Sequence, residues 1–264
     1  FLLALLFYKK GLIMKLWLAL IRAELLKLKR TLALAMIFVA PTVVVALQVA
    51  LLFNNKEGWG FDVDMWKYFY NSLTSLWAIF MLPLFSALVV ALVYHYEHAN
   101  NGWLKLFALP VPKSMIIATK QIVSTGIVLA SMLVLLLATI AGGFVLKVLH
   151  PNMNFPTEIP ILTLLARSGL VFISAFALIA IQNWVSMRWS TLAVSLGVGI
   201  AGTFVALFAA GWKYGHFYPW LIPIRVLNGQ EQDWYTMALL VGSVGGLVLF
   251  IAGLLDATRR ERFN

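Results

Sequence analysis

The chain has 264 residues, of which 62% are hydrophobic and 11% are charged, whereas soluble domains usually have roughly 45–50% and about 25%. This composition excludes an ordinary soluble domain and indicates a membrane protein. The formal net charge of +10 does not indicate nucleic-acid binding, because the basic residues are neither clustered on a polar segment nor interleaved with stacking aromatics.

The chain begins with two adjoining segments. Residues 1–13 are apolar except for Lys9 and Lys10 and precede Met14, a natural first residue, so we expect them to be an upstream or cloning-derived extension. Residues 14–31 predict an amphipathic helix, with apolar residues on one stripe and basic residues on another. We expect this helix to lie along the inner membrane surface. The alternative is a basic flank that only orients the first span.

Six apolar stretches follow, each of 20 to 26 residues and long enough to cross about 30 Å of hydrocarbon as a helix. They are residues 32–53, 72–93, 121–146, 168–187, 191–211 and 235–255. Alternating ten-residue strands of a membrane barrel are not found. The sequence therefore predicts an all-α integral membrane protein whose residues 14–264 form one transmembrane domain.

The distribution of basic residues predicts the orientation. An even number of spans places both termini on one side, together with fourteen of the 20 lysines and arginines. The other six are Lys56, Lys67, Lys147, Arg167, Lys213 and Arg225. Because lysine and arginine are retained on the cytoplasmic side, we expect both termini to be cytoplasmic.

Few polar residues lie within the spans. Gln48, Gln121, Gln182 and Asn183 lie near or within spans and could line a substrate path, although hydrogen bonds between helices would explain them equally well. The spans carry almost no ionisable groups, which argues against an ion-coupled carrier.

Small residues recur at four-residue spacing in the last two spans. Ser195 and Gly199 form one such pair, and Gly242 and Gly246 form another. Small side chains let two helices approach closely. These residues therefore predict tight packing, either within one subunit or between two subunits.

Motifs for chemistry are absent from the sequence. His95, Glu97 and His98 offer too few ligands for zinc, and the other two histidines map to the opposite side of the membrane. There is no GxxxxGK[ST] loop for nucleotide phosphates and no GxSxG or HExxH motif. We therefore expect no catalytic residue, metal or cofactor on this chain.

The segment between the second and third spans is short and polar but carries apolar residues. If residues 97–107 are helical, Trp103, Leu106 and Phe107 project from one side, and Pro110 and Pro112 end the helix. So short a helix cannot bury these side chains alone. We expect a cytosolic partner to cover them, with membrane headgroups as the alternative.

These features resemble the permease subunits of type 2 ABC exporters, most closely the small permeases of lantibiotic or bacitracin self-protection. The resemblance extends from Met14 to the C-terminus, and residues 1–13 fit nothing in it. It is carried by the six spans and by two segments. The segments are Arg22-Ala23-Glu24-Leu25-Leu26-Lys27-Leu28-Lys29-Arg30, and the loop with Glu97, Trp103-Leu104-Lys105, Leu109-Pro110-Val111-Pro112-Lys113 and Lys120.

The resemblance implies partners and a docking surface. In that family two separate ATPase subunits bind ATP and Mg²⁺, and the permease pairs with a second copy or a sibling permease in the bacterial cytoplasmic membrane. The docking surface corresponds to Arg22, Glu24, Glu97, Asn100, Trp103, Leu104, Leu106 and Phe107. The implied function is export of an amphiphilic peptide or lipid-like compound. An anchoring or assembly subunit and an intramembrane enzyme are the alternatives, and the sequence does not identify the substrate.

Overall fold

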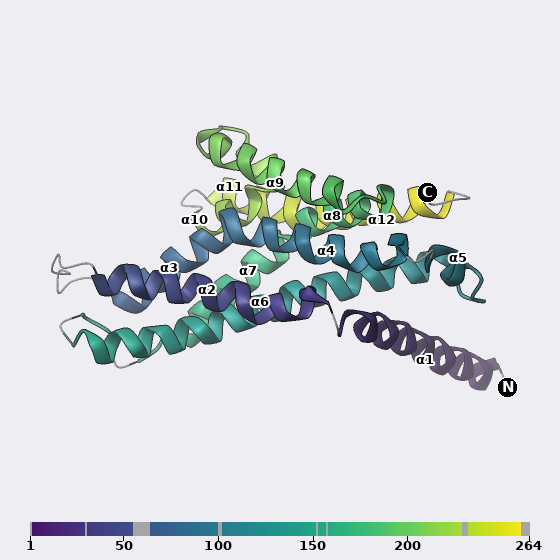
Figure 1. Ribbon diagram of the computed structural model, residues 1–264, viewed down its shortest axis with the longest axis horizontal. Coiled ribbons are helices and arrows are strands. Elements are labelled where there is room, and N and C mark those ends of the chain that lie inside the picture. The colour runs from purple at the N-terminus through teal and green to yellow at the C-terminus, as the bar shows by residue number, and fades with distance from the viewer. Residues whose placement is uncertain are drawn as a thin grey trace.

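The computed structural model describes residues 2–29, 31–54, 64–99, 102–151, 153–156, 158–228 and 232–259, and within these residues it contains helices and no strand. Among the described residues, six helices are long and apolar enough to cross a membrane. They are Leu32–Asn54, Met65–Ala99, Lys113–Leu149, Ile161–Arg188, Leu192–Gly211 and Tyr235–Arg259. The six predicted spans are thus confirmed, and most helices extend beyond the predicted ends. Both termini lie at the same end of the bundle (Figure 1).

The helical segments have the following bounds. They are α1 Leu2–Leu28, α2 Leu32–Asn54, α3 Met65–Leu76, η1 Trp77–Met81, α4 Leu82–Ala99, α5 Gly102–Phe107, α6 Lys113–Leu149, α7 Ile161–Ser174, α8 Phe176–Arg188, α9 Leu192–Phe208, η2 Ala209–Gly211, η3 Gly215–Phe217, α10 Ile222–Asn228, α11 Gln232–Leu240, η4 Val241–Gly245 and α12 Gly246–Arg259. The second span consists of α3, η1 and α4, the fourth of α7 and α8, and the sixth of α11, η4 and α12.

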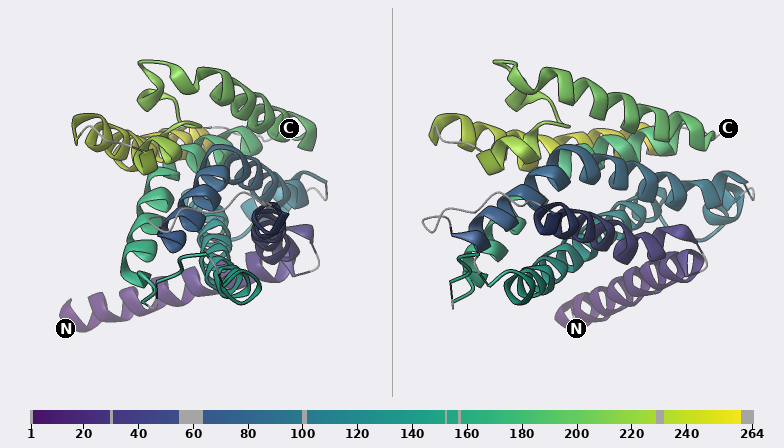
Figure 2. Two further views of the ribbon diagram at one scale, coloured as in Figure 1. Left: turned by 90° about the vertical axis from the view of Figure 1, so that its left-hand side faces the viewer. Right: turned by 60° about the vertical axis from the view of Figure 1, so that its left-hand side comes forward.

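Helix α1 is one continuous helix from Leu2 to Leu28, so the predicted helix of residues 14–31 starts earlier than its predicted boundary. It runs obliquely to the six long helices and projects from the bundle at its N-terminal end (Figures 1 and 2). It packs mainly against α6 and touches α2 and α4. In its described part, Glu24 and Leu28 are buried, whereas Leu18 and Leu26 are exposed. Its placement on a membrane surface stays a prediction.

The second span is the centre of the bundle. In the most apolar 18-residue stretch of this span, 61% of the residues are buried, whereas 22–50% are buried in the corresponding stretches of the other spans. The span begins at the N-cap Asp64, whose carboxylate accepts hydrogen bonds from the backbone N–H groups of Trp66 and Lys67. Its helix widens into a π-turn just before Pro83, where the N–H of Leu82 bonds to the carbonyl of Trp77. A wider turn accommodates a proline, which has no N–H and crowds the preceding turn.

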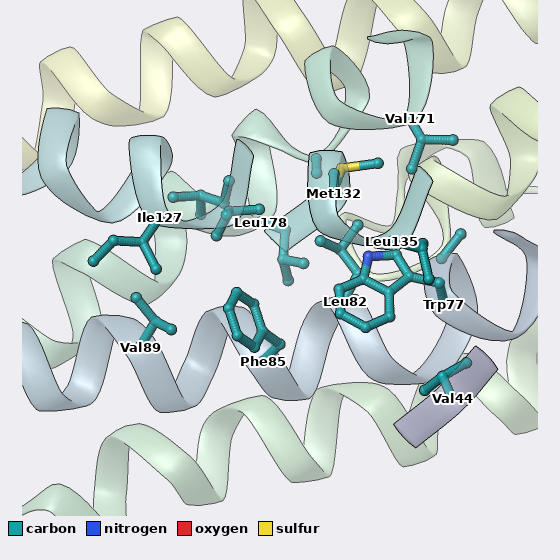
Figure 3. Packing of buried hydrophobic residues seen from close by; sticks show 14 of the residues in the cluster. Val44, Trp77, Leu82, Phe85, Val89, Ile127, Met132, Leu135, Val171 and Leu178 are labelled. Carbon is teal, nitrogen blue, oxygen red and sulfur yellow. The ribbon is translucent and has the colours of Figure 1, made fainter. Parts of the chain in front are cut away.

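The apolar core lies between α4, α6 and α8, with contributions from η1 and α2. Figure 3 shows Phe85 and Val89 of α4 facing Ile127 of α6 and Leu178 of α8, and Trp77 lies beside Leu135. The core also reaches the end of the bundle where α1 crosses, because the buried Leu28 belongs to the same cluster. This packing holds α1, α4 and α6 together at the end that carries both termini.

Candidate functional site

Four charged side chains from three helices meet at the end of the bundle that carries α5. We call Glu24 and Lys27 of α1, Glu97 of α4 and Lys120 of α6 the ion cluster. Lys27 Nζ lies 2.7 Å from Glu24 Oε1 and 2.6 Å from Glu97 Oε1. Lys120 Nζ lies 2.8 Å from Glu24 Oε2 and 3.1 Å from Glu97 Oε1. Each lysine therefore bridges both carboxylates, so that α1 is linked to α4 and α6.

The ion cluster is buried and its charges balance. The side chain of Lys120 is fully buried, and those of Glu97 and Lys27 are 2% and 22% exposed. Lys120 Nζ also lies 3.4 Å from the carbonyl of Val93, and it sits over the rings of Tyr94 and Trp103. Buried charges are tolerated only when they are paired and hydrogen-bonded. Two cations and two anions meet that condition here.

The electrostatics of the cluster keep Lys27 charged. Burial lowers the pKa of Lys27, but the neighbouring carboxylates of Glu24 and Glu97 outweigh this effect and hold the pKa above its ordinary value of 10.5. Lys27 is therefore a cation at neutral pH, and the link between α1 and α4 is ionic under physiological conditions.

Trp103, at the start of α5, is packed against the chain itself. It is only 4% exposed, and its ring lies 6.0 Å from that of Tyr94 and 5.5 Å, stacked, from that of Phe107. Its indole Nε1 donates to His98 Nδ1 over 3.2 Å. The expectation that Trp103 projects from a short helix and needs a partner to cover it is therefore wrong, because α4 and Phe107 cover it.

Gly102 permits this close packing of α5 on α4. A Cβ atom at this position would overlap the Oε2 atom of Glu97 and would lie 2.9 Å from the Glu97 Cα. The Glu97 side chain, which belongs to the ion cluster, thus occupies the space beside Gly102. The packing of α5 and the placement of this carboxylate are consequently coupled.

The exposed part of α5 is small. Leu104 is 74% exposed, Lys105 is exposed, and Leu106 and Phe107 are half-buried. Lys113 Nζ lies 5.1 Å from the centre of the Phe107 ring. The remaining residues predicted for ATPase docking divide into three groups: Arg22 is exposed on α1, Glu24 and Glu97 are buried in the ion cluster, and Asn100 lies outside the described residues. The docking role itself stays a prediction.

Of the polar residues considered for a substrate path, Gln48, Gln182 and Asn183 do not share a cavity among those described, whereas Gln121 lines a cleft between α6 and α12. Gln48 donates to Ser72 Oγ over 3.1 Å, and Asn183 donates to the carbonyl of Ile179 over 2.8 Å. Gln182 is fully buried beside Gly199, and its amide has no hydrogen-bond partner within the described part of the chain. Gln48 thus fits the alternative of hydrogen bonds between helices, whereas the bond of Asn183 lies within α8.

The small residues of the last two spans pack within this chain. Ser195 hydrogen-bonds to Ser186 of α8, and a Cβ at Gly199 would collide with Ala87 of α4. Gly242 lies against the backbone of residue 174, and Gly246 lies where a Cβ would come within 2.6 Å of the nitrogen of residue 177. All four are buried, which fits the alternative of packing within one subunit. A role between subunits stays a prediction.

The polar residues at the end of α4 form hydrogen bonds or ion pairs with neighbouring side chains and backbone. His98 accepts from Trp103, and its Nε2 lies 3.0 Å from the carbonyl of Ser186, while Glu97 contacts both lysines of the cluster. Among the described residues there is no group of three or more histidine, aspartate or glutamate side chains that could hold a metal ion.

The sequence does not identify Lys27 and Lys120 as members of a cluster. Both look like basic residues near the membrane surface, because the third span is predicted to begin at residue 121. The helix instead begins at Lys113, which places Lys120 two turns inside it. The sequence contains one signal for the cluster: Glu24 and Glu97, two of only ten acidic residues, lie in segments close to these lysines.

The fold is that of a multi-pass helical membrane protein in which the ion cluster links three helices at the end that carries both termini. The profile of the ABC-2 family transporter proteins matches residues 20–206, which is well over half of the chain, and the chain belongs to this family. It is thus the membrane-spanning permease component of an ABC transporter, whose family implies an ATPase partner. No curated protein sequence matches the chain.

Proposed function

We propose that this permease subunit serves an ATP-driven exporter that moves an amphiphilic compound, such as a peptide antibiotic or a lipid-like molecule, out of a bacterial cell. Family membership supports the permease role. The direction and the substrate class rest on the resemblance to lantibiotic and bacitracin self-protection permeases. An amphiphilic substrate suits the spans, whose central turns carry no charged side chain in the part of the chain that the structure describes.

The motor of this exporter lies on other chains. Because the sequence has no phosphate-binding loop, ATP and Mg²⁺ are bound by two separate ATPase subunits. A second copy of the chain or a sibling permease completes the transporter in the lipid bilayer, and nucleic acid has no role. Fourteen basic residues on the side of the termini support a cytoplasmic position for both termini and for α5 in the bacterial cytoplasmic membrane.

The observation that carries the proposal is the ion cluster beside the exposed Leu104. A force that an ATPase applies to α1 passes to α4 and α6 through buried ion pairs of 2.6–3.1 Å. A force applied to α5 passes to α4 through the packing of Trp103 and Gly102. Since α4 and α6 belong to the second and third spans, movement at this end changes the arrangement of the bundle. Leu104, 74% exposed on α5, is the apolar side chain that the partner would cover.

A substitution at Leu104 tests the docking step. We expect Leu104→Glu to reduce by at least about tenfold the ATP hydrolysis that co-purifies with the affinity-tagged chain, because a central apolar contact typically contributes 2 kcal/mol or more. The melting temperature should not change, since Leu104 is exposed. Leu162→Glu is the matched control, because Leu162 is 82% exposed at the start of α7. Full ATPase recovery with Leu104→Glu would contradict docking at α5.

A transport assay separates the exporter from the two alternatives. Inverted membrane vesicles that contain the complex should accumulate a fluorescent lipopeptide only when ATP and Mg²⁺ are present. An anchoring or assembly subunit would bind the ATPase without any nucleotide-dependent accumulation. An intramembrane enzyme would convert the lipopeptide without nucleotide, which mass spectrometry of the extracted compound would detect.

A further inference from the structure

A cleft of about 520 Å³ lies between α6, α12 and the junction of α7 and α8, away from the ion cluster. We call it the α6–α12 cleft. It is lined by Trp17, Gln121, Thr125, Leu129, Phe176 and Phe250, among others. Its volume falls within the roughly 300–1,000 Å³ of small-molecule sites. Lys120 is next to Gln121 in sequence, but its side chain is fully buried in the ion cluster.

The cleft contains polar groups without partners. Gln121 is only 3% exposed, and neither its amide nitrogen nor its amide oxygen has a hydrogen-bond partner within the described residues. The hydroxyl of Thr125, one turn further along α6, likewise has none among them. Leaving such groups unpaired away from water is unfavourable by about 1–3 kcal/mol each. These atoms lie just behind the surface of the cleft, with almost no accessible area, so a rotation of either side chain toward the cleft would let a carbonyl or hydroxyl group of a bound molecule satisfy them.

The polarity of the cleft changes along its length. Gln121, Thr125 and Leu129 follow each other at four-residue spacing on one face of α6. Trp17 of α1 also lines the cleft, and apart from Gln121 and Thr125 its other walls are apolar. Two lining residues, Ile122 and Leu247, are 46% and 50% exposed, so the cleft opens onto an apolar surface of the bundle. In a membrane that surface faces hydrocarbon.

We infer that the α6–α12 cleft binds a single-chain amphiphile from the membrane. Its carbonyl or hydroxyl group bonds to Gln121 and Thr125, and its hydrocarbon chain lies along α6 against Phe176 and Phe250. Its polar end is directed toward α1, where the indole of Trp17 provides an amphipathic border. A bilayer lipid and a transported compound share this chemistry. The inference does not depend on export, because the cleft is formed by this chain alone.

Gly126 offers a substitution that fills the cleft without disturbing the fold. It lines the cleft, and a Cβ at this position would meet no atom within 4 Å. Leucine is also more favourable than glycine within a helix. Gly126→Leu should therefore occupy the cleft and leave the melting temperature unchanged or slightly raised. Gly197→Leu is the matched control, because Gly197 is an exposed glycine of α9 with equally open surroundings.

The probe is a lysophosphatidylcholine with a photoactivatable diazirine in its acyl chain, added to the purified full chain in nanodiscs. We expect saturable labelling of α6 and α12 peptides, detected by mass spectrometry and competed by unlabelled lysophosphatidylcholine. Gly126→Leu should reduce this labelling by about tenfold or more, equivalent to 1.4 kcal/mol. Gln121→Leu should weaken it by about three- to tenfold, because one hydrogen bond is lost. Gly197→Leu should label like the wild type.

Two results would overturn the inference. The first is equal labelling of the wild type and Gly126→Leu, or an equal loss with Gly197→Leu. The second is an interchain disulfide formed by Gly126→Cys, which would mean that a second copy of the chain covers the cleft. Addition of ATP and Mg²⁺ to the complex with its ATPase identifies the source of the ligand. Release of the probe indicates a transported compound and retention indicates a resident lipid, and both results support binding in the cleft.

Discussion

At the scale of single residues, Lys120 is the charge on which the ion cluster depends most. Its side chain is fully buried and contacts both Glu24 and Glu97. Removing it leaves two buried carboxylates with Lys27 alone. Because an uncompensated buried charge is unfavourable, we expect Lys120→Met to lower the free energy of unfolding by about 3–5 kcal/mol. Thermal unfolding of the purified protein in detergent measures the change.

Two comparisons show whether this loss comes from the charge. Lys67 pairs with Asp64 at 3.2 Å, but its side chain is 63% exposed, so Lys67→Met should change stability by less than about 1 kcal/mol. The double variant Lys120→Met with Glu97→Gln removes one charge of each sign and should recover part of the lost stability. A double variant that is as unstable as the sum of its single variants would show that the two side chains do not interact.

Lys27 gives the ion cluster its dependence on pH. Since its pKa in the folded protein lies above the ordinary 10.5, its contribution to stability is fully present below about pH 10.5 and is lost as the pH rises through the higher folded value. The difference in melting temperature between the wild type and Lys27→Met should therefore stay constant from about pH 7 to pH 10 and shrink above that range. A difference that already shrinks between pH 7 and 9 would contradict the ionic link.

At the scale of helices, the crossing of the fourth and sixth spans depends on glycine. A Cβ at Gly246 would come within 2.6 Å of the nitrogen of Ala177 and 2.9 Å of the carbonyl carbon of Phe176, and backbone atoms cannot move aside easily. We expect Gly246→Ala to lower the free energy of unfolding by about 1–3 kcal/mol, as overpacked sites do. The adjacent Gly245→Ala is the control, because its Cβ would meet only Val241 at 3.7 Å. Equal melting temperatures for the two variants would argue against this crossing.

The positions of the long helices could be predicted from hydropathy, but their ends and partners could not. Hydropathy places the third span at residues 121–146, whereas the helix runs from Lys113 to Leu149. Its early turns include Lys120, whose ion pairs join it to α1 and α4. Lys120 looks like a surface charge in sequence and becomes a core residue only when α1 brings Glu24 beside it. Likewise, Trp103 looks exposed on a six-residue helix until Tyr94 and His98 of α4 are placed against it. Contacts of this kind join different helices, so they produce no pattern of hydrophobic periodicity along the sequence.

At the scale of the whole molecule, the two ends of the bundle differ in what they present. One end carries both termini, α1 and α5, and it includes the ion cluster. The other end carries the C-terminal ends of α2, α6 and α9. Lys213 follows α9 in the chain. An ATPase that uses cytosolic nucleotide can reach only the cytoplasmic end. The proposed function therefore requires that the end with α5 faces the cytosol.

Because the chain has no cysteine, single introduced cysteines report which end faces the cytosol. Lys105 and Lys213 are exposed at opposite ends. We expect a membrane-impermeant maleimide to label Lys213→Cys in intact cells and to label Lys105→Cys only after permeabilisation, since fourteen of the 20 basic residues lie on the side of Lys105. A gel shift of the tagged protein measures the labelling. Labelling of Lys105→Cys in intact cells would place α5 outside, where no cytosolic ATPase could bind it, while the ion cluster and the fold would be unaffected.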